Sequence, residues 1–193
     1  MKIGRRSGGA KKESLRAELQ EILRSGRSDG PVCGPGCARP DSRACSRACP
    51  DIPRALSSDP DNHPLETRIA PLVFELKRLG VFEPCWSCAG HNGADGALWK
   101  VPRVWFYCRS VVHVRVLAES IQELHLHKKL NAPWHIVITF SEHDNADTTF
   151  SLEPRLEGRR PNLTALQTDI EAIAEHLRDL VFREVEKLSA AIK

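Results

Sequence analysis

The chain has 193 residues, seven cysteines and a net charge of only +3. This length fits one domain with an appended segment, and it is long enough to bury a core without disulfide staples. No stretch approaches the roughly 20 apolar residues that a bilayer-spanning helix needs, so we expect no membrane association through such a helix. The basic, glycine-rich start lacks the apolar segment of a signal peptide, which predicts a cytoplasmic protein.

Residues 1–62 are predicted to form a basic, flexible arm. Apolar positions at helical spacing predict a short amphipathic helix from Lys11 to Ser25, ended by Gly26. The rest of the arm is rich in Gly, Pro, Ser and Arg, and its few apolar residues give no basis for a core. The excess of basic residues allows a nucleic-acid partner, although no aromatic residues interleave with them to stack on bases.

Residues 63–193 are predicted to form a compact α+β domain. Its fold class is a small mixed or antiparallel sheet of about four strands, covered by three helices and preceded by the cysteine-rich, irregular arm. The expected elements are, in chain order, a helix over 69–79 ended by Gly80, an extended segment over 81–88, a turn-rich loop over 92–96, a strand over 101–108, a helix capped by Ser110, strands over 134–140 and 147–152, and a long helix capped by Asn162.

The last helix is long for a domain of this size. About 26 residues at 1.5 Å per residue give roughly 40 Å, which exceeds the width of a small domain. Its apolar stripe continues to Val185 and Leu188. We therefore expect the far end to project or to pair with a second subunit, which predicts a homodimer.

The arm contains four cysteines with the spacing C-x3-C-x7-C-x3-C, namely Cys33, Cys37, Cys45 and Cys49. In a reducing compartment such a cluster indicates metal ligands or redox groups rather than disulfides. Four thiolates suit a tetrahedral zinc ion, whose binding would supply folding energy to a segment without a core. An iron–sulfur cluster uses the same ligands, and Pro50 after Cys49 is also found in ferredoxin motifs. The remaining alternative is four free thiols in a flexible linker.

A second group of reactive residues is Cys85, Cys88 and His91, in the pattern C-x2-C-x2-H. They are candidates for a metal site whose fourth position is filled by Cys108, His113 or His143 or left open, for a redox dithiol, or for a thiol nucleophile activated by the histidine. The glycines that follow Cys88 disfavour a helix opening there, which argues against a thioredoxin-type pair. A tight structural turn is the fourth alternative.

The peptide from Pro84 to His91 resembles a loop of uncharacterised bacterial proteins, in which a Ser-Cys-x-Gly-His turn joins a helix to a strand. The resemblance covers about 25 residues and implies no established activity. Taken together, the residues favour a metal-binding, non-catalytic interaction or regulatory protein. A thiol- or metal-dependent enzyme using Cys85, Cys88 and His91 is the alternative, and a nucleic-acid-binding module is the third.

Overall fold

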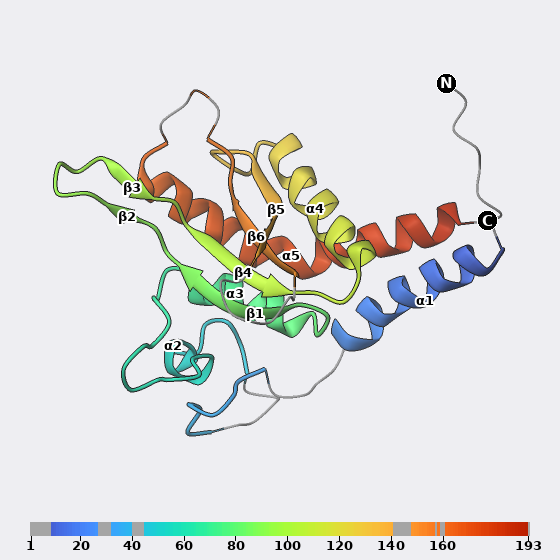
Figure 1. Cartoon of the computed structure of the whole chain (residues 1–193), viewed down its shortest axis with the longest axis horizontal. Helices are drawn as coiled ribbons and strands as arrows, with labels where there is room; N and C mark the ends of the chain where they lie inside the picture. The colour runs from blue at the N-terminus through green and yellow to red at the C-terminus, as the bar shows by residue number, and fades with distance from the viewer. Residues whose placement is uncertain are drawn as a thin grey trace.

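The computed structural model shows an α+β protein with an antiparallel sheet and a second, smaller sheet (Figure 1), which confirms the predicted fold class. It describes residues 9–26, 32–39, 45–140, 148–156, 158 and 161–192. The larger sheet has the spatial order β1 (Glu83–Cys88), β4 (Arg103–Tyr107), β6 (Thr148–Pro154), β5 (Trp134–Phe140), and the smaller one pairs β2 (His91–Asn92) with β3 (Leu98–Lys100). The helices are α1 (Gly9–Gly26), α2 (Ile52–Ala55), α3 (Ala70–Arg78), α4 (Val111–Leu126) and α5 (Leu163–Ala191).

Three helix boundaries lie where the capping residues predicted them. The Ser110 hydroxyl accepts a hydrogen bond from the Val112 N–H at 3.0 Å, and the Asn162 side chain accepts one from the Ala165 N–H at 2.8 Å. Gly80 follows α3 with a φ of +72°, a conformation that glycine adopts without steric cost. No helix in the described part of the chain is long and apolar enough to cross a membrane.

Strand β6 lies between β4 and β5 and contributes Phe150 and Leu152 to the main core. Val104 pairs with Leu152, and Phe106 pairs with Phe150, so buried apolar side chains of the two strands lie opposite one another. The Phe106 and Phe150 rings stack with centroids 5.8 Å apart. The predicted pairing of the two strands over 134–140 and 147–152 is confirmed. The turn predicted to join them falls on residues 142–145, outside the described residues.

Helix α5 runs behind the sheet for most of the length of the molecule, and α1 lies beside its C-terminal part (Figure 1). Leu19 and Ile22 of α1 are fully buried in the main core. Leu188 and Ile192, near the end of α5, are partly buried against the same core. The stripe expected to project is therefore covered within the chain by α1, α3 and α4. The homodimer stays a prediction, without support from this surface.

The chain between α1 and α3 packs against α3. A second apolar cluster contains Val32 and Ile52 from the arm with Ala70 and Phe74 from α3. Phe74 is only 1% exposed, so burying its ring contributes substantially to this contact. The expectation that apolar packing could not order this segment is wrong, because its few apolar residues have a partner surface on α3. The domain boundary between 62 and 63 stays a prediction.

The loop predicted over 92–96 is the tip of a β-hairpin made by β2 and β3. The Gly93 N–H donates to the Ala97 carbonyl at 2.7 Å, and Gly96 adopts a φ of +75°. These two glycines close the turn between the strands, where the sequence predicted a turn-rich loop but no strands on either side of it. The hairpin projects from the body of the molecule (Figure 1), and its base begins at His91.

Candidate metal centres

The four cysteines of the arm lie in irregular segments on either side of the undescribed residues 40–44, and all four are half-buried. The Cys37 N–H donates to the Gly34 carbonyl at 3.1 Å, which closes a turn that ends at Cys37. The Ile52 N–H donates to the Cys49 carbonyl at 3.2 Å, so Cys49 leads directly into α2. Cys33, Cys45 and Cys49 all pack against the cluster formed with Phe74.

The Cys33 and Cys45 sulfur atoms lie 3.8 Å apart. A disulfide would require about 2.05 Å, so these are two separate thiols. Two thiolates bound about 2.3 Å from one tetrahedral ion lie about 3.8 Å from each other. The two halves of the arm thus place one cysteine each at the spacing that a shared metal ion requires.

The environment of Cys33 also involves Cys37. The pKa of Cys33 is raised to about 12, first by burial and then by the neighbouring Cys45 and Cys37 thiols. Two thiolates side by side repel each other, and a bound cation removes that repulsion. Within the described ranges, no three of the four arm sulfurs all lie within 4.8 Å of one another. The structure therefore shows a cysteine cluster around Cys33, and the complete four-cysteine site stays a prediction.

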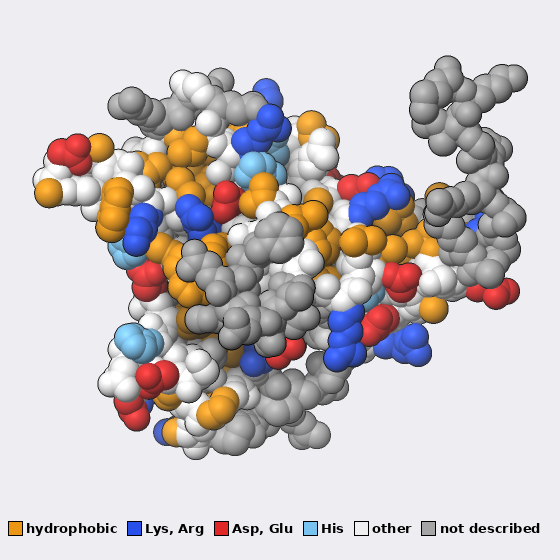
Figure 2. Space-filling model, viewed as in Figure 1, with side chains coloured by type: hydrophobic (Ala, Val, Ile, Leu, Met, Phe, Trp, Pro, Cys, Tyr) orange, Lys and Arg blue, Asp and Glu red, His pale blue; other side chains and the backbone are white. Residues whose placement is uncertain are grey.

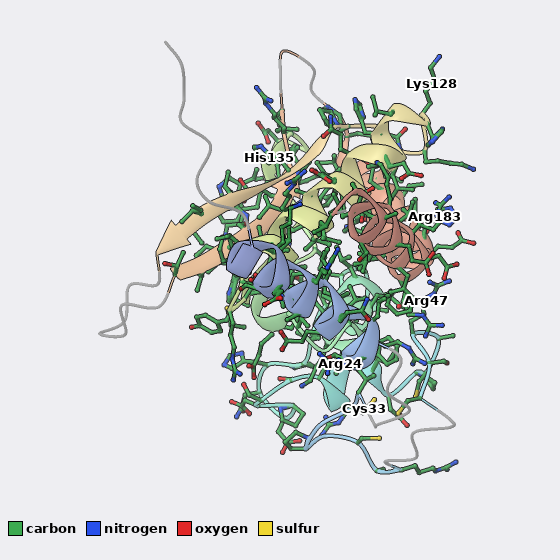
Figure 3. The ribbon with its side chains drawn as sticks, turned by 90° about the vertical axis from the view of Figure 1, so that its right-hand side faces the viewer. Arg24, Cys33, Arg47, Lys128, His135 and Arg183 are labelled. Carbon is green, nitrogen blue, oxygen red and sulfur yellow. The ribbon has the colours of Figure 1, made fainter. Side chains whose placement is uncertain are left out.

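Two arginines attach the cysteine segment to the helices. The Arg47 guanidinium donates to the Ala174 carbonyl in α5 at 2.6 Å and lies 3.7 Å from the Glu75 carboxylate in α3. Burial raises the pKa of Glu75, and Arg47 and Arg78 act in the opposite direction. Arg78 also donates to the Cys45 carbonyl at 3.4 Å. Figure 3 shows Cys33 and Arg47 in the lower part of the molecule, below α5.

Gly36 allows the turn between Cys33 and Cys37 to approach α2. A Cβ atom at Gly36 would lie 2.2 Å from the Arg54 carbonyl oxygen, whereas one at Gly34 would lie 3.4 Å from its nearest neighbour. Overpacking of this kind costs about 1–3 kcal/mol. We therefore expect Gly36→Ala to accelerate modification of Cys33 by a thiol reagent about tenfold in metal-free protein.

Gly34→Ala is the matched control for this substitution, because it adds the same methyl group two residues away. It should change the modification rate of Cys33 little. Equal rates in the two variants, measured by peptide mass spectrometry, would mean that the turn does not contact α2 as described.

The second predicted group is only partly assembled. Cys88 and His91 come together, but Cys85 does not join them: it is exposed on β1 and hydrogen-bonds with Tyr107. The third member is Glu66, a residue that the sequence did not indicate. In the described part of the chain, Glu66, Cys88 and His91 form the group whose ligand atoms all lie within 4.8 Å of one another.

Two of the three residues that the sequence offered as a fourth ligand, Cys108 and His113, make other contacts. The Cys108 thiol donates to the Ser110 carbonyl at 3.3 Å, and the His113 ring contacts the Glu18 carbonyl at 2.9 Å. His113 therefore belongs to the contact between α1 and α4, and Cys108 to the loop that leads into α4. His143 lies outside the described residues.

Glu66 is held just ahead of α3. Its carbonyl accepts hydrogen bonds from the Ile69 and Ala70 N–H groups, both at 3.1 Å. Its carboxylate accepts one from the Ala89 N–H at 2.8 Å through Oε2, while Oε1 lies 3.4 Å from His91 Nε2. In Figure 2 a histidine and an acidic side chain are side by side at the surface below the hairpin.

Comparisons with protein families, with curated proteins and with solved structures gave no match to this chain. The resemblance of the loop from Pro84 to His91 to uncharacterised bacterial proteins stays a prediction. The fold and the side-chain geometry are therefore the basis for a functional proposal.

Proposed function

We propose that this protein is a metal-binding, non-catalytic interaction or regulatory protein whose ion is held by Cys33, Cys37, Cys45 and Cys49. The observation that carries the proposal is the 3.8 Å separation of the Cys33 and Cys45 sulfur atoms. Four protein thiolates fill a tetrahedral coordination sphere and leave no position for a substrate, which is typical of structural sites. The ion would fasten both halves of the arm to each other and to the surface of α3.

We propose zinc as the ion, with an iron–sulfur cluster as the alternative, because both use four thiolates. The Cys33 thiol has its pKa raised to about 12 by burial first and by its neighbouring thiols second, so it is protonated at neutral pH without a metal. Metal binding must displace this proton. The affinity of the arm for zinc should therefore fall as the pH is lowered.

The test is the metal content of the full chain, purified without oxygen, and of the variant Cys45→Ser/Cys49→Ser. We expect the variant to lose one equivalent of zinc because two of four ligands are gone. The far-UV circular dichroism of the main domain should be kept, because neither cysteine belongs to the main core. A visible absorption band together with bound iron would instead identify the cluster.

Cys108→Ser is the matched control, because Cys108 is also half-buried but lies against Ser110. It should leave the metal content unchanged. If the double variant retains the same metal stoichiometry as the unmodified chain, the arm is not a metal site and the proposal is wrong.

The alternative, a thiol- or metal-dependent enzyme, is favoured by one observation, the proximity of Cys88 and His91. Cys85 contributes nothing to that group as the structure places it. The cytoplasmic location stays a prediction. The nucleic-acid partner also stays a prediction, since the first eight residues of the basic arm lie outside the described residues. Nucleic-acid binding through the arm would show an affinity that falls steeply with salt.

A further inference from the structure

We propose that Glu66, Cys88 and His91 form a second metal site, distinct from the arm, which binds zinc through three protein ligands and keeps a fourth position open to solvent. The proposal goes beyond the function assigned to the arm and does not depend on it. One carboxylate, one thiolate and one imidazole are all ligands that zinc accepts. Three protein ligands and an exchangeable water are the usual composition of an open zinc site.

The distances fit one ion better than they fit a direct contact between the side chains. His91 Nε2 lies 3.4 Å from Glu66 Oε1, which is longer than an ordinary hydrogen bond. Two ligands about 2.1 Å from one tetrahedral ion lie about 3.4 Å apart. The Cys88 sulfur lies within 4.8 Å of a ligand atom of each of the other two side chains, so the three residues are close enough to share one ion.

The surroundings hold these ligands in place. The Cys88 sulfur accepts a hydrogen bond from the Gly90 N–H at 3.4 Å, and such a donor suits the charge of a thiolate, the form that binds metal. The second oxygen of Glu66 is occupied by the Ala89 N–H, which orients Oε1 towards His91. On the other side of the loop, Gln167 of α5 donates to the Ala89 carbonyl at 3.1 Å. Contacts of this kind orient metal ligands in known sites.

The site is accessible from solvent, unlike a structural centre enclosed by four ligands. Cys88 is only 5% exposed, but the side chains of Glu66 and His91 are 40% and 45% exposed. Glu66 also lines a cavity of about 830 Å³ between the arm and β1.

The experiment uses the full chain carrying Cys45→Ser/Cys49→Ser, so that the arm does not compete for metal. This protein should bind one equivalent of Co²⁺, with the tetrahedral absorption and the charge-transfer band of a single sulfur ligand. Adding Glu66→Gln keeps an oxygen that can accept from the Ala89 N–H but removes the anionic ligand. We expect it to weaken Co²⁺ and Zn²⁺ binding by more than about 100-fold, beyond the effect of outer contacts.

Two further variants make the result specific. His91→Ala removes a ligand from an exposed position and should cause a similar loss without unfolding the chain. His63→Ala changes a histidine in the wall of the cavity that Glu66 lines and should leave the affinity unchanged. Imidazole should shift the cobalt spectrum if the fourth position is open.

The proposal is overturned if the arm-deficient protein binds no Co²⁺, if Glu66→Gln and His91→Ala bind it as tightly as their parent, or if imidazole leaves the spectrum unchanged. The two proposals fail separately. Loss of all metal on mutating the arm would remove this second site alone, whereas unchanged metal content in that variant would remove the arm site alone.

Discussion

Replacing Asp169 with alanine should lower the free energy of unfolding by about 3–5 kcal/mol, because it leaves several buried donors without an acceptor. The Asp169 carboxylate is fully buried in α5. It accepts hydrogen bonds from the Asn131 N–H at 2.7 Å, the Asn131 side-chain amide at 2.8 Å, the Ala132 N–H at 3.1 Å and the Trp134 indole N–H at 3.1 Å. One side chain thus fastens the connection between α4 and β5 to α5.

The free energy of unfolding of Asp169→Ala should be measured by urea unfolding, followed by circular dichroism and by tryptophan fluorescence, since Trp134 is one of the donors. Asp179→Ala is the control, because it removes the same side chain from an exposed position of the same helix. It should change stability by no more than about 0.5 kcal/mol. A similar small effect for Asp169→Ala would show that these hydrogen bonds are replaced by water at little cost.

The second large effect is expected at Gly90, which lies between Cys88 and His91. Gly90 has a φ of +81°, and a Cβ atom there would lie 2.6 Å from Leu163 and 2.9 Å from Pro102. A left-handed conformation costs a residue with a side chain about 1–2 kcal/mol, and overpacking adds about 1–3 kcal/mol. We expect Gly90→Ala to destabilise the protein by about 2–5 kcal/mol and to displace His91 from Glu66.

Gly96→Ala separates the cost of the left-handed backbone from the cost of overpacking. Gly96 has a φ of +75°, but a Cβ atom there would have no neighbour within 4 Å. This variant should lose only the backbone contribution of about 1–2 kcal/mol. Equal losses in the two variants, measured by urea unfolding, would mean that Leu163 and Pro102 yield to the added methyl group.

Much of the fold could be predicted because its signals are local. Runs of apolar and aromatic residues identified β4 and β5, and the capping residues Ser110 and Asn162 located the starts of α4 and α5. Helix α2 was missed because four residues around Pro53 carry no periodicity. The position of the arm was missed for another reason: Val32 and Ile52 have few apolar neighbours in the sequence, and their partner Phe74 belongs to a helix further along.

The candidate sites, too, could be predicted only where their residues are close together in the sequence. The arm cysteines could be selected by spacing alone, and Cys88 and His91 are three residues apart in one loop. Glu66 could not be selected, because it is 22 residues from Cys88 and carries no motif. Only the packing of α3 against β1 brings it to the loop. Cys85 is not part of this group as the structure places it, because its thiol hydrogen-bonds with Tyr107.

The packing of α1 against α5 has a consequence for how the chain can be divided. A shortened protein that begins at residue 63, where the sequence suggested a boundary, would lack Leu19 and Ile22. The faces of α4 and α5 that α1 covers would then be bare, and an uncovered apolar strip of this kind promotes aggregation. We therefore expect a fragment without α1 to self-associate through these faces of α4 and α5 more strongly than the intact chain does.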